Sequence, residues 1–282
     1  MAARPTAAAP ASIPPGAIFV PTAGSASTTI TSAAAPNRQP GGDAAAAPNL
    51  LVLLHGAGDT PAPFARLAAK LALPNTASLA LRAPFRLGPD GWTWFEEGED
   101  EACDAASLEA ARPALAASID AAGWPRHRVH LFGYGEGGAA VLDLVLAAAN
   151  GGLGPGPAGS GAGGRRWGSA VTVGAALLPG ALRRLAGRQQ AGAAAAPSHP
   201  TTPVLLTRGE WDGVGAPAPA AAATVGALRA AGLADACLHT VPGKGGGMLG
   251  PDREEVEAVM KHWARCLAAP VPAGCVEASE VG

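Results

Sequence analysis

The chain has 282 residues, a formal net charge of −2, and 15% charged and 4% aromatic residues. Its 69 alanines, 39 glycines and 27 prolines make up nearly half of the sequence, so much of the 48% apolar fraction is alanine, which buries little area per residue. Near neutrality without a Lys/Arg run excludes the basic surface that nucleic acid or an anionic membrane requires. No apolar stretch approaches the ~18 uncharged residues of a membrane-spanning helix, so we expect no membrane span and no nucleic-acid partner.

The N-terminal segment, residues 1–48, is low in complexity and carries only three charged residues. It holds too few large apolar residues to offset the entropy cost of ordering, so we predict that most of it is disordered. Within it, the β-branched and aromatic run 16–21 is typical of an edge strand. An organellar transit peptide is an alternative interpretation, although the arginine density is low and no amphipathic period is present.

The four cysteines are widely spaced and form no CxxC pair. In a chain too long to need disulfides this favours a reducing compartment, and we expect a cytoplasmic protein without a metal or another cofactor. The acidic run 96–101 is typical of a solvated loop. Metal binding is the alternative, and it requires a convergence of carboxylates that a sequence does not show.

Three internal segments rich in glycine and alanine, 151–166, 187–200 and 213–223, are predicted to be surface loops or insertions. The last of them runs into a helix. Residues 271–282 are predicted to form a flexible tail. The remaining sequence suits a single domain over residues 49–270.

Six short apolar runs have the composition of buried parallel strands. They are Leu50–Leu54, Ser78–Leu81, Val129–Phe132, Ala170–Val173, Pro203–Thr207 and Cys237–Val241. Helical patterns lie between them. Thr60 and Pro61 open one helix, and Asp252 with Glu255 forms a capping box before the last one. This alternation predicts an α/β fold, with a mostly parallel sheet covered by helices on both faces and chemistry at the carboxyl ends of the strands.

The strand ends carry an ordered set of motifs. The first long strand runs into LLVLLHGAGD and the third into HLFGYGEGG; LPNTASLALRAPF, WTWFEEG, PVLLTRGEWD and VPGKGGGM complete the set. The set resembles the phospholipase/carboxylesterase family of α/β-hydrolases, which includes the acyl-protein thioesterases. The resemblance covers residues 50–267. It implies the α/β-hydrolase fold, hydrolysis of carboxylic esters or fatty acyl thioesters, a small-molecule or acylated-protein substrate, and a monomer or homodimer.

The resemblance also implies roles for individual residues. The backbone N–H groups of Ala57 and Glu136 correspond to the oxyanion donors, and Asp212 corresponds to the acid of the triad. The nucleophile position in the G-x-S-x-G elbow is Gly135, and the histidine position is Gly246. Glycine supplies neither an attacking oxygen nor an imidazole, and Asp212 then has nothing to orient. The sequence therefore predicts a weakly active or inactive relative of the hydrolases that keeps an ester-binding cleft.

The predicted cleft is lined by residues next to these positions. They are His55, Gly56, Trp92, Trp94, Phe95 and Tyr134. For Trp92, Trp94 and Phe95, a place in the core is an equally good interpretation.

No other side chain stands where it would replace the missing ones. The six histidines, His55, His127, His130, His199, His239 and His262, are interpreted as structural or solvated. Cys103 follows an acidic run, which raises a thiol pKa and argues against a nucleophile.

Two alternatives stay open. One is an active carboxylesterase or thioesterase that uses unidentified groups. The other, more distant, is a dinucleotide-binding protein, because Gly133, Gly135 and Gly138 satisfy G-x-G-x-x-G between a strand and a helix. Against it, no acidic residue follows about 20 positions later to hold a ribose, and Glu136 would repel phosphate.

Overall fold

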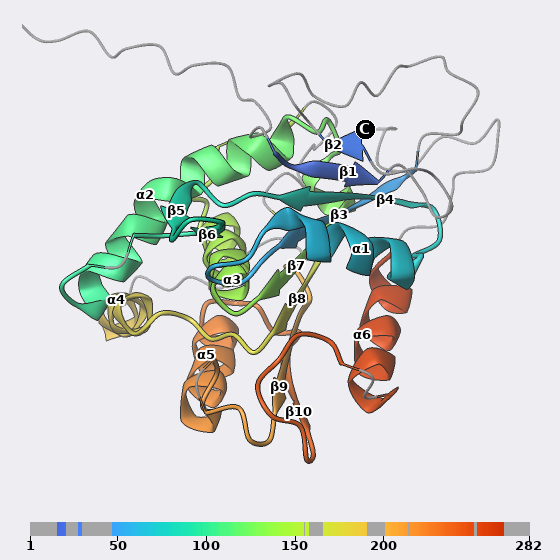
Figure 1. Ribbon diagram of the computed structural model, residues 1–282. Coiled ribbons are helices and arrows are strands. Elements are labelled where there is room, and N and C mark those ends of the chain that lie inside the picture. Colours follow the sequence, from blue (N-terminus) through green and yellow to red (C-terminus); the bar gives the residue numbers. More distant parts are fainter. Residues whose placement is uncertain are drawn as a thin grey trace, which may run out of the picture.

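The structure is a computed structural model that describes residues 16–20, 28–29, 47–96, 98–154, 156–157, 166–190, 201–213, 215–250 and 253–267. The predicted tail 271–282 and most of segment 1–48 lie outside these residues. One eight-stranded sheet, in the order β10-β9-β8-β7-β3-β4-β1-β2, organises the molecule (Figure 1). Its strands are β1 (Ile18–Val20), β2 (Thr28–Thr29), β3 (Asn49–Leu54), β4 (Thr76–Leu81), β7 (Val129–Tyr134), β8 (Ser169–Val173), β9 (Val204–Gly209) and β10 (Ala236–Val241).

Six neighbouring strands of this sheet are mutually parallel and correspond to the six predicted apolar runs. They are β10, β9, β8, β7, β3 and β4. β1 lies within the run 16–21 and pairs antiparallel with β4. It is not an edge strand, because Ile18 and Phe19 also pair with Thr29 and Thr28 of β2. The edge on this side is therefore β2, which the sequence did not predict.

Helices cover both faces of the sheet, as predicted (Figure 1). Along β3, Leu50, Val52 and Leu54 contribute to one core and Leu51 and Leu53 to the other, because successive side chains point to opposite faces. The first core includes α2 (Glu101–Asp120), α3 (Glu136–Ala149), α4 (Pro179–Gln190) and α5 (Ala218–Ala230), and the second includes α1 (Pro61–Leu71) and α6 (Arg253–Cys266). In the described part of the chain, no helix has both the length and the apolar character needed to cross a membrane.

Two of the predicted helix starts differ in their chemistry. Thr60 precedes α1 as its N-cap residue, but its side chain makes no capping hydrogen bond. Asp252 lies outside the described residues, and the Glu255 carboxylate is fully buried. It accepts hydrogen bonds from Thr207 Oγ1 (2.8 Å) and Lys244 Nζ (2.5 Å). Glu255 therefore ties α6 to β9 and to the loop that carries Lys244.

Parts of two predicted insertions are held by the fold. The segment 187–200 begins inside α4, which continues to Gln190. In the segment 151–166, Leu153 packs against the core, and the Gly154 carbonyl accepts a hydrogen bond from Arg126 Nη1 at 2.8 Å. A two-stranded hairpin, β5 (Phe85–Leu87) and β6 (Gly91–Thr93), is an element that the sequence did not predict.

Candidate functional site

Gly135 forms the turn between β7 and α3. Its backbone angles are φ 53° and ψ −119°, a conformation that residues with a side chain rarely adopt. The turn is held by hydrogen bonds from Gly135 N to Val173 O (3.0 Å) and from Ala139 N to Gly135 O (3.1 Å). Among the described atoms, a Cβ atom built on Gly135 would meet only Gly56 Cα, at 4.0 Å. The turn is thus a strand-to-helix elbow that would strain any residue but glycine, with open space at its Cβ position.

The glycines around the elbow permit close packing of α3. A Cβ on Gly133 would lie 2.4 Å from Gly137 O, and one on Gly138 would lie 2.3 Å from Ala175 Cβ. A Cβ on Gly137 would lie 2.4 Å from the Leu54 carbonyl oxygen of β3. Close packing at Gly133 and Gly138, together with the positive φ of Gly135, therefore accounts for the G-x-G-x-x-G pattern without a bound nucleotide.

Glu136 begins α3 and places its carboxylate near that helix's N-terminus. Its Oε2 atom accepts hydrogen bonds from Thr93 Oγ1 (2.5 Å) and from the Trp94 backbone N–H (3.5 Å). An acidic side chain is itself stabilised by the positive end of a helix dipole, and it repels a second anion there. This disfavours phosphate binding at α3.

Asp212 follows β9 at the same edge of the sheet and is only 4% exposed. Its Oδ1 atom accepts a hydrogen bond from Gly215 N at 3.0 Å. The buried Arg208 guanidinium lies nearby, but it donates to the main-chain oxygens of Asp212 (3.2 Å) and Ala216 (2.8 Å). Among the described residues the Asp212 carboxylate has no ion-pair partner.

Gly246 lies in the loop from β10 to α6, directly beside this carboxylate. A Cβ atom on Gly246 would lie 3.4 Å from Asp212 Oδ1, and its one other neighbour among the described atoms within 4 Å would be Asp212 Cγ. The loop is fixed against β9, because Trp211 N donates to Lys244 O (2.9 Å) and Gly243 N donates to Glu210 Oε2 (2.9 Å). The structure therefore brings positions 212 and 246 together.

Tyr134, the last residue of β7, lies between two neighbouring strand ends. Its ring approaches the positions that Cβ atoms on Gly56 and Gly174 would occupy, at 2.9 and 3.7 Å. Burial raises the pKa of the Tyr134 phenol, and the negative charges of Asp212 and Asp59 raise it further. The two carboxylates thus act on one half-buried phenol.

The predicted cleft residue His55 is instead a structural group. It is fully buried; its Nδ1 atom donates to Gly56 O (2.7 Å), since Nε2 accepts from the Ala83 backbone N–H (3.1 Å). Burial lowers the pKa of His55, which keeps the imidazole neutral. The following residue, Ala57, is exposed, and its N–H forms no hydrogen bond within the part of the chain that the structure describes.

The tryptophan segment divides between core and surface. Trp94 and Phe95 are 2% and 5% exposed and belong to the core, and Trp94 Nε1 donates to His55 O at 2.7 Å. For these two residues the core interpretation is therefore the correct one. Trp92 is half-buried beneath the Arg82 guanidinium, which lies 4.0 Å from the ring centroid.

Two residues near the site, Thr93 and Gly174, were not predicted from the sequence. Thr93 bonds the Glu136 carboxylate, and Gly174 adopts φ 58° with its would-be Cβ 3.0 Å from Asp212 Oδ2. Gly174 directly follows a predicted strand, so the strand-end rule applied to every strand would have found it. Thr93 carries no such local signal.

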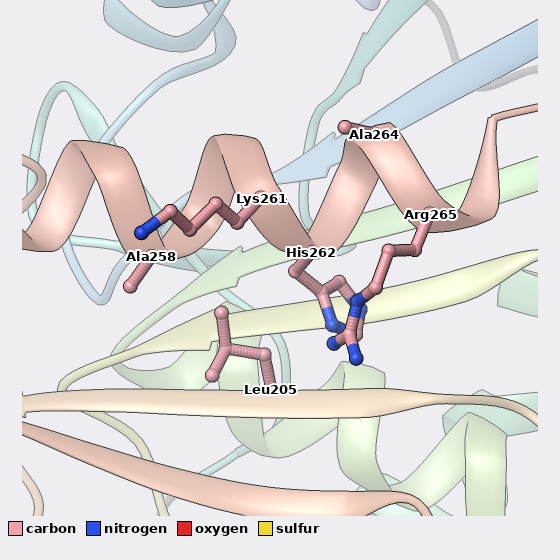
Figure 2. Close-up of a pocket in the computed structure, with 6 residues that line it drawn as sticks. All are labelled: Leu205, Ala258, Lys261, His262, Ala264 and Arg265. Atoms are coloured by element: carbon pink, nitrogen blue, oxygen red, sulfur yellow. The ribbon is translucent and has the colours of Figure 1, made fainter.

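A shallow pocket lies against α6 and involves none of these residues. Figure 2 shows His262 pointing from α6 toward the sheet, next to Arg265. The lining residues are Leu205, Ala258, Lys261, His262, Ala264 and Arg265. His262 is 2% exposed, and burial followed by the charge of Arg265 lowers its pKa to about 4. It is a buried neutral histidine away from the strand ends, as the structural interpretation of the histidines expected.

Comparison with known proteins finds one family model that matches part of the chain. Residues 42–154 match the model of the phospholipase/carboxylesterase family. An uncharacterized hydrolase of Mycosarcoma maydis is 33% identical over 113 residues, covering 35% of this chain and 42% of that protein. The chain therefore spans less than half the length of the curated relatives it matches.

Solved structures share the fold at lower identity. Esterase PE8 superposes with a TM-score of 0.60 at 23% identity, covering 78% of this chain and 94% of that one. Acyl-protein thioesterase 2 of Zea mays superposes with a TM-score of 0.53 at 21% identity, covering 76% and 93%. The α/β-hydrolase fold and the family resemblance predicted from the sequence are confirmed.

Proposed function

Because residues 42–154 carry the phospholipase/carboxylesterase pattern on an α/β-hydrolase fold, we propose that this hydrolase relative binds an ester or acyl thioester with little or no turnover. One observation carries the proposal. The elbow conformation is present, but its residue is Gly135, and the position facing Asp212 is Gly246. The strand ends therefore have the backbone of a serine hydrolase without its nucleophile and base.

The expected loss of rate is large. Removing one triad member from a serine hydrolase abolishes most of its rate, and removing a second adds little, so a residual ~10³-fold to 10⁴-fold over water remains. Backbone donors supply this remainder. The proposed donors to a carbonyl oxygen are the backbone N–H groups of Ala57, an exposed residue, and of Glu136, at the start of α3.

The proposal also covers the ligand class, the oligomeric state and the compartment. The ligand is a small ester, an acyl thioester or an acylated protein, bound without metal or cofactor by a monomer or homodimer whose domain spans residues 49–270. The free thiols of Cys103, Cys237 and Cys266 support a reducing, cytoplasmic setting.

The first test measures activity of the purified full chain. We expect no hydrolysis of a chromogenic short-chain ester above background and no labelling by a fluorophosphonate probe, since the elbow residue is Gly135 and not a serine. Labelling, or turnover like that of an ordinary esterase, would overturn the proposal and favour an active enzyme that uses other groups.

A gain-of-function variant tests the residue assignment. The double substitution Gly135→Ser with Gly246→His should raise esterase activity at least about tenfold above either single variant, because nucleophile and base act as a unit. The matched control is Gly135→Ser with Gly245→His, since position 245 is also open but does not border Asp212. Equal activity of the two double variants, both folded, would show that the site is misplaced.

A further inference from the structure

The Asp212 carboxyl group is buried and has few hydrogen-bond partners. Asp212 is 4% exposed. Among the described residues, its carboxyl group accepts a single hydrogen bond, from Gly215 N to Oδ1. An ionised carboxylate has about four acceptor positions, and an unpaired buried charge is costly. The oxygens therefore have unused acceptor capacity.

Glycines border both oxygens of this carboxylate. The Cβ position of Gly246 lies 3.4 Å from Oδ1, and that of Gly174 lies 3.0 Å from Oδ2. At Gly245 and Gly247, a Cβ would meet no described atom within 4 Å. Side-chain-free space thus adjoins the acceptor atoms at the edge of the loop.

The other groups around this space also favour a cation. The Tyr134 ring lies 3.7 Å from the Gly174 Cβ position, and an aromatic face attracts cations. The buried Arg208 guanidinium donates to the main-chain oxygens of Ala216, Glu210 and Asp212.

We propose that the Asp212 carboxylate and the space beside Gly246 form a receptor for a nitrogen base carried by the ligand, an imidazole or a small ammonium group. An N–H of the base donates to Asp212 Oδ1, and the remainder of the base occupies the volume that a side chain at position 246 would fill. The inference deepens the proposed function, on which it rests, by giving the bound ester or thioester a basic group.

Direct binding tests the receptor without any need for turnover. Imidazole or ethylamine is titrated into the full chain and followed by protein NMR, with thiazole as a ring of similar size that lacks an N–H. We expect saturable binding of the two bases and none of thiazole. Absence of base binding to the wild type would overturn the receptor.

Three variants locate the binding. Asp212→Asn and Gly246→Leu should each weaken binding about tenfold or more, because they remove the charged acceptor and fill the space, respectively. Gly245→Leu, one position away, should leave binding unchanged. Binding that survives both Asp212→Asn and Gly246→Leu in folded proteins would contradict the proposal, and Gly246→Leu keeps the test decisive if Asp212→Asn fails to fold.

Rescue of activity gives a second readout. In Gly135→Ser, added imidazole would accept the Ser Oγ proton as Oγ bonds to the ester carbonyl carbon, and then give that proton to the departing alcohol oxygen. Water would next attack the acyl carbon and lose a proton to the imidazole, which returns it to Oγ as the acyl–Oγ bond breaks and the acid is released. We expect ester hydrolysis that rises with imidazole and saturates at the concentration that saturates binding; rescue without saturation would count against a bound base. Ester hydrolysis by the wild type would refute the proposed function and leave base binding intact, so the two failures are distinguishable.

Discussion

At the residue scale, a small side chain at position 135 would strain the backbone without clashing with the described neighbours. The φ of 53° at Gly135 penalises any L-residue, whereas the space at its Cβ position is open to 4.0 Å. A substitution there therefore measures backbone strain almost alone. Glycine at this position makes the elbow easier to form.

Gly135→Ala should accordingly lower the free energy of unfolding by about 1–3 kcal/mol, the usual cost of a strained backbone position. Chemical denaturation measures the change. The control is Gly226→Ala on the exposed side of α5, where helix propensity favours alanine by up to about 1 kcal/mol. A Gly135→Ala protein as stable as the wild type would show that the elbow is relaxed.

The positions of Gly135, Asp212 and Gly246 were predictable because a strand end and the residues after it are local in the sequence. The burial of His55 and Trp94 was not, because it depends on partners that the sheet brings together. His55 accepts from Ala83, 28 residues away, and Trp94 donates to His55, 39 residues away. Such contacts leave no pattern at either residue.

At the element scale, a buried ion pair fixes α6 and the loop that carries Gly246. Lys244 and Glu255 are 9% and 0% exposed, and Glu255 also accepts from Thr207 of β9. Lys244 lies two residues before Gly246 in the sequence. The pair therefore holds the position of the loop beside Asp212.

Lys244→Met should lower the free energy of unfolding by about 3–5 kcal/mol, because it leaves the Glu255 charge buried without a partner. Thermal and urea unfolding measure it. Lys261→Met is the matched control, since Lys261 pairs with Glu257 on the exposed side of the same helix and should change stability far less. If Lys244→Met with Glu255→Leu is no more stable than Lys244→Met alone, an unpaired charge is not the cause.

The long apolar strands could be predicted from the sequence, whereas the short or exposed strands could not. Each of the six parallel strands has five or six residues, and four of them, β3, β4, β8 and β9, are buried throughout. β2 has only two residues, and in the β5–β6 hairpin Arg86 and Leu87 are exposed. These short strands form because an adjacent strand supplies hydrogen-bond partners, as β1 does for β2.

At the scale of the whole molecule, two buried histidines couple stability to pH. Burial lowers the pKa of His130 to about 3, with smaller effects of His262, Arg128 and Arg166, and the pKa of His262 is about 4. Both imidazoles stay neutral in the folded state at pH 5. The unfolded chain, with pKa values near 6.5, binds protons there.

Stability should therefore fall as the pH drops from about 6.5 to 4, by about 2 kcal/mol per imidazole at pH 5. His262→Leu should flatten this dependence by removing one of the two groups. Urea unfolding at pH 7 and pH 5 compares the proteins, and the carboxylates titrate alike in both. Equal pH slopes for wild type and variant would contradict this assignment.

The strand order has a consequence for assembly during synthesis. β8, β9 and β10 each join the edge left by the strand before it, so the carboxyl half extends the sheet outward in the order of translation. The pairing of β3 with β7 is different, because it closes a long stretch of chain around β4 and α2. Once β7 is in place, the growing chain has a template at its edge for each strand that leaves the ribosome.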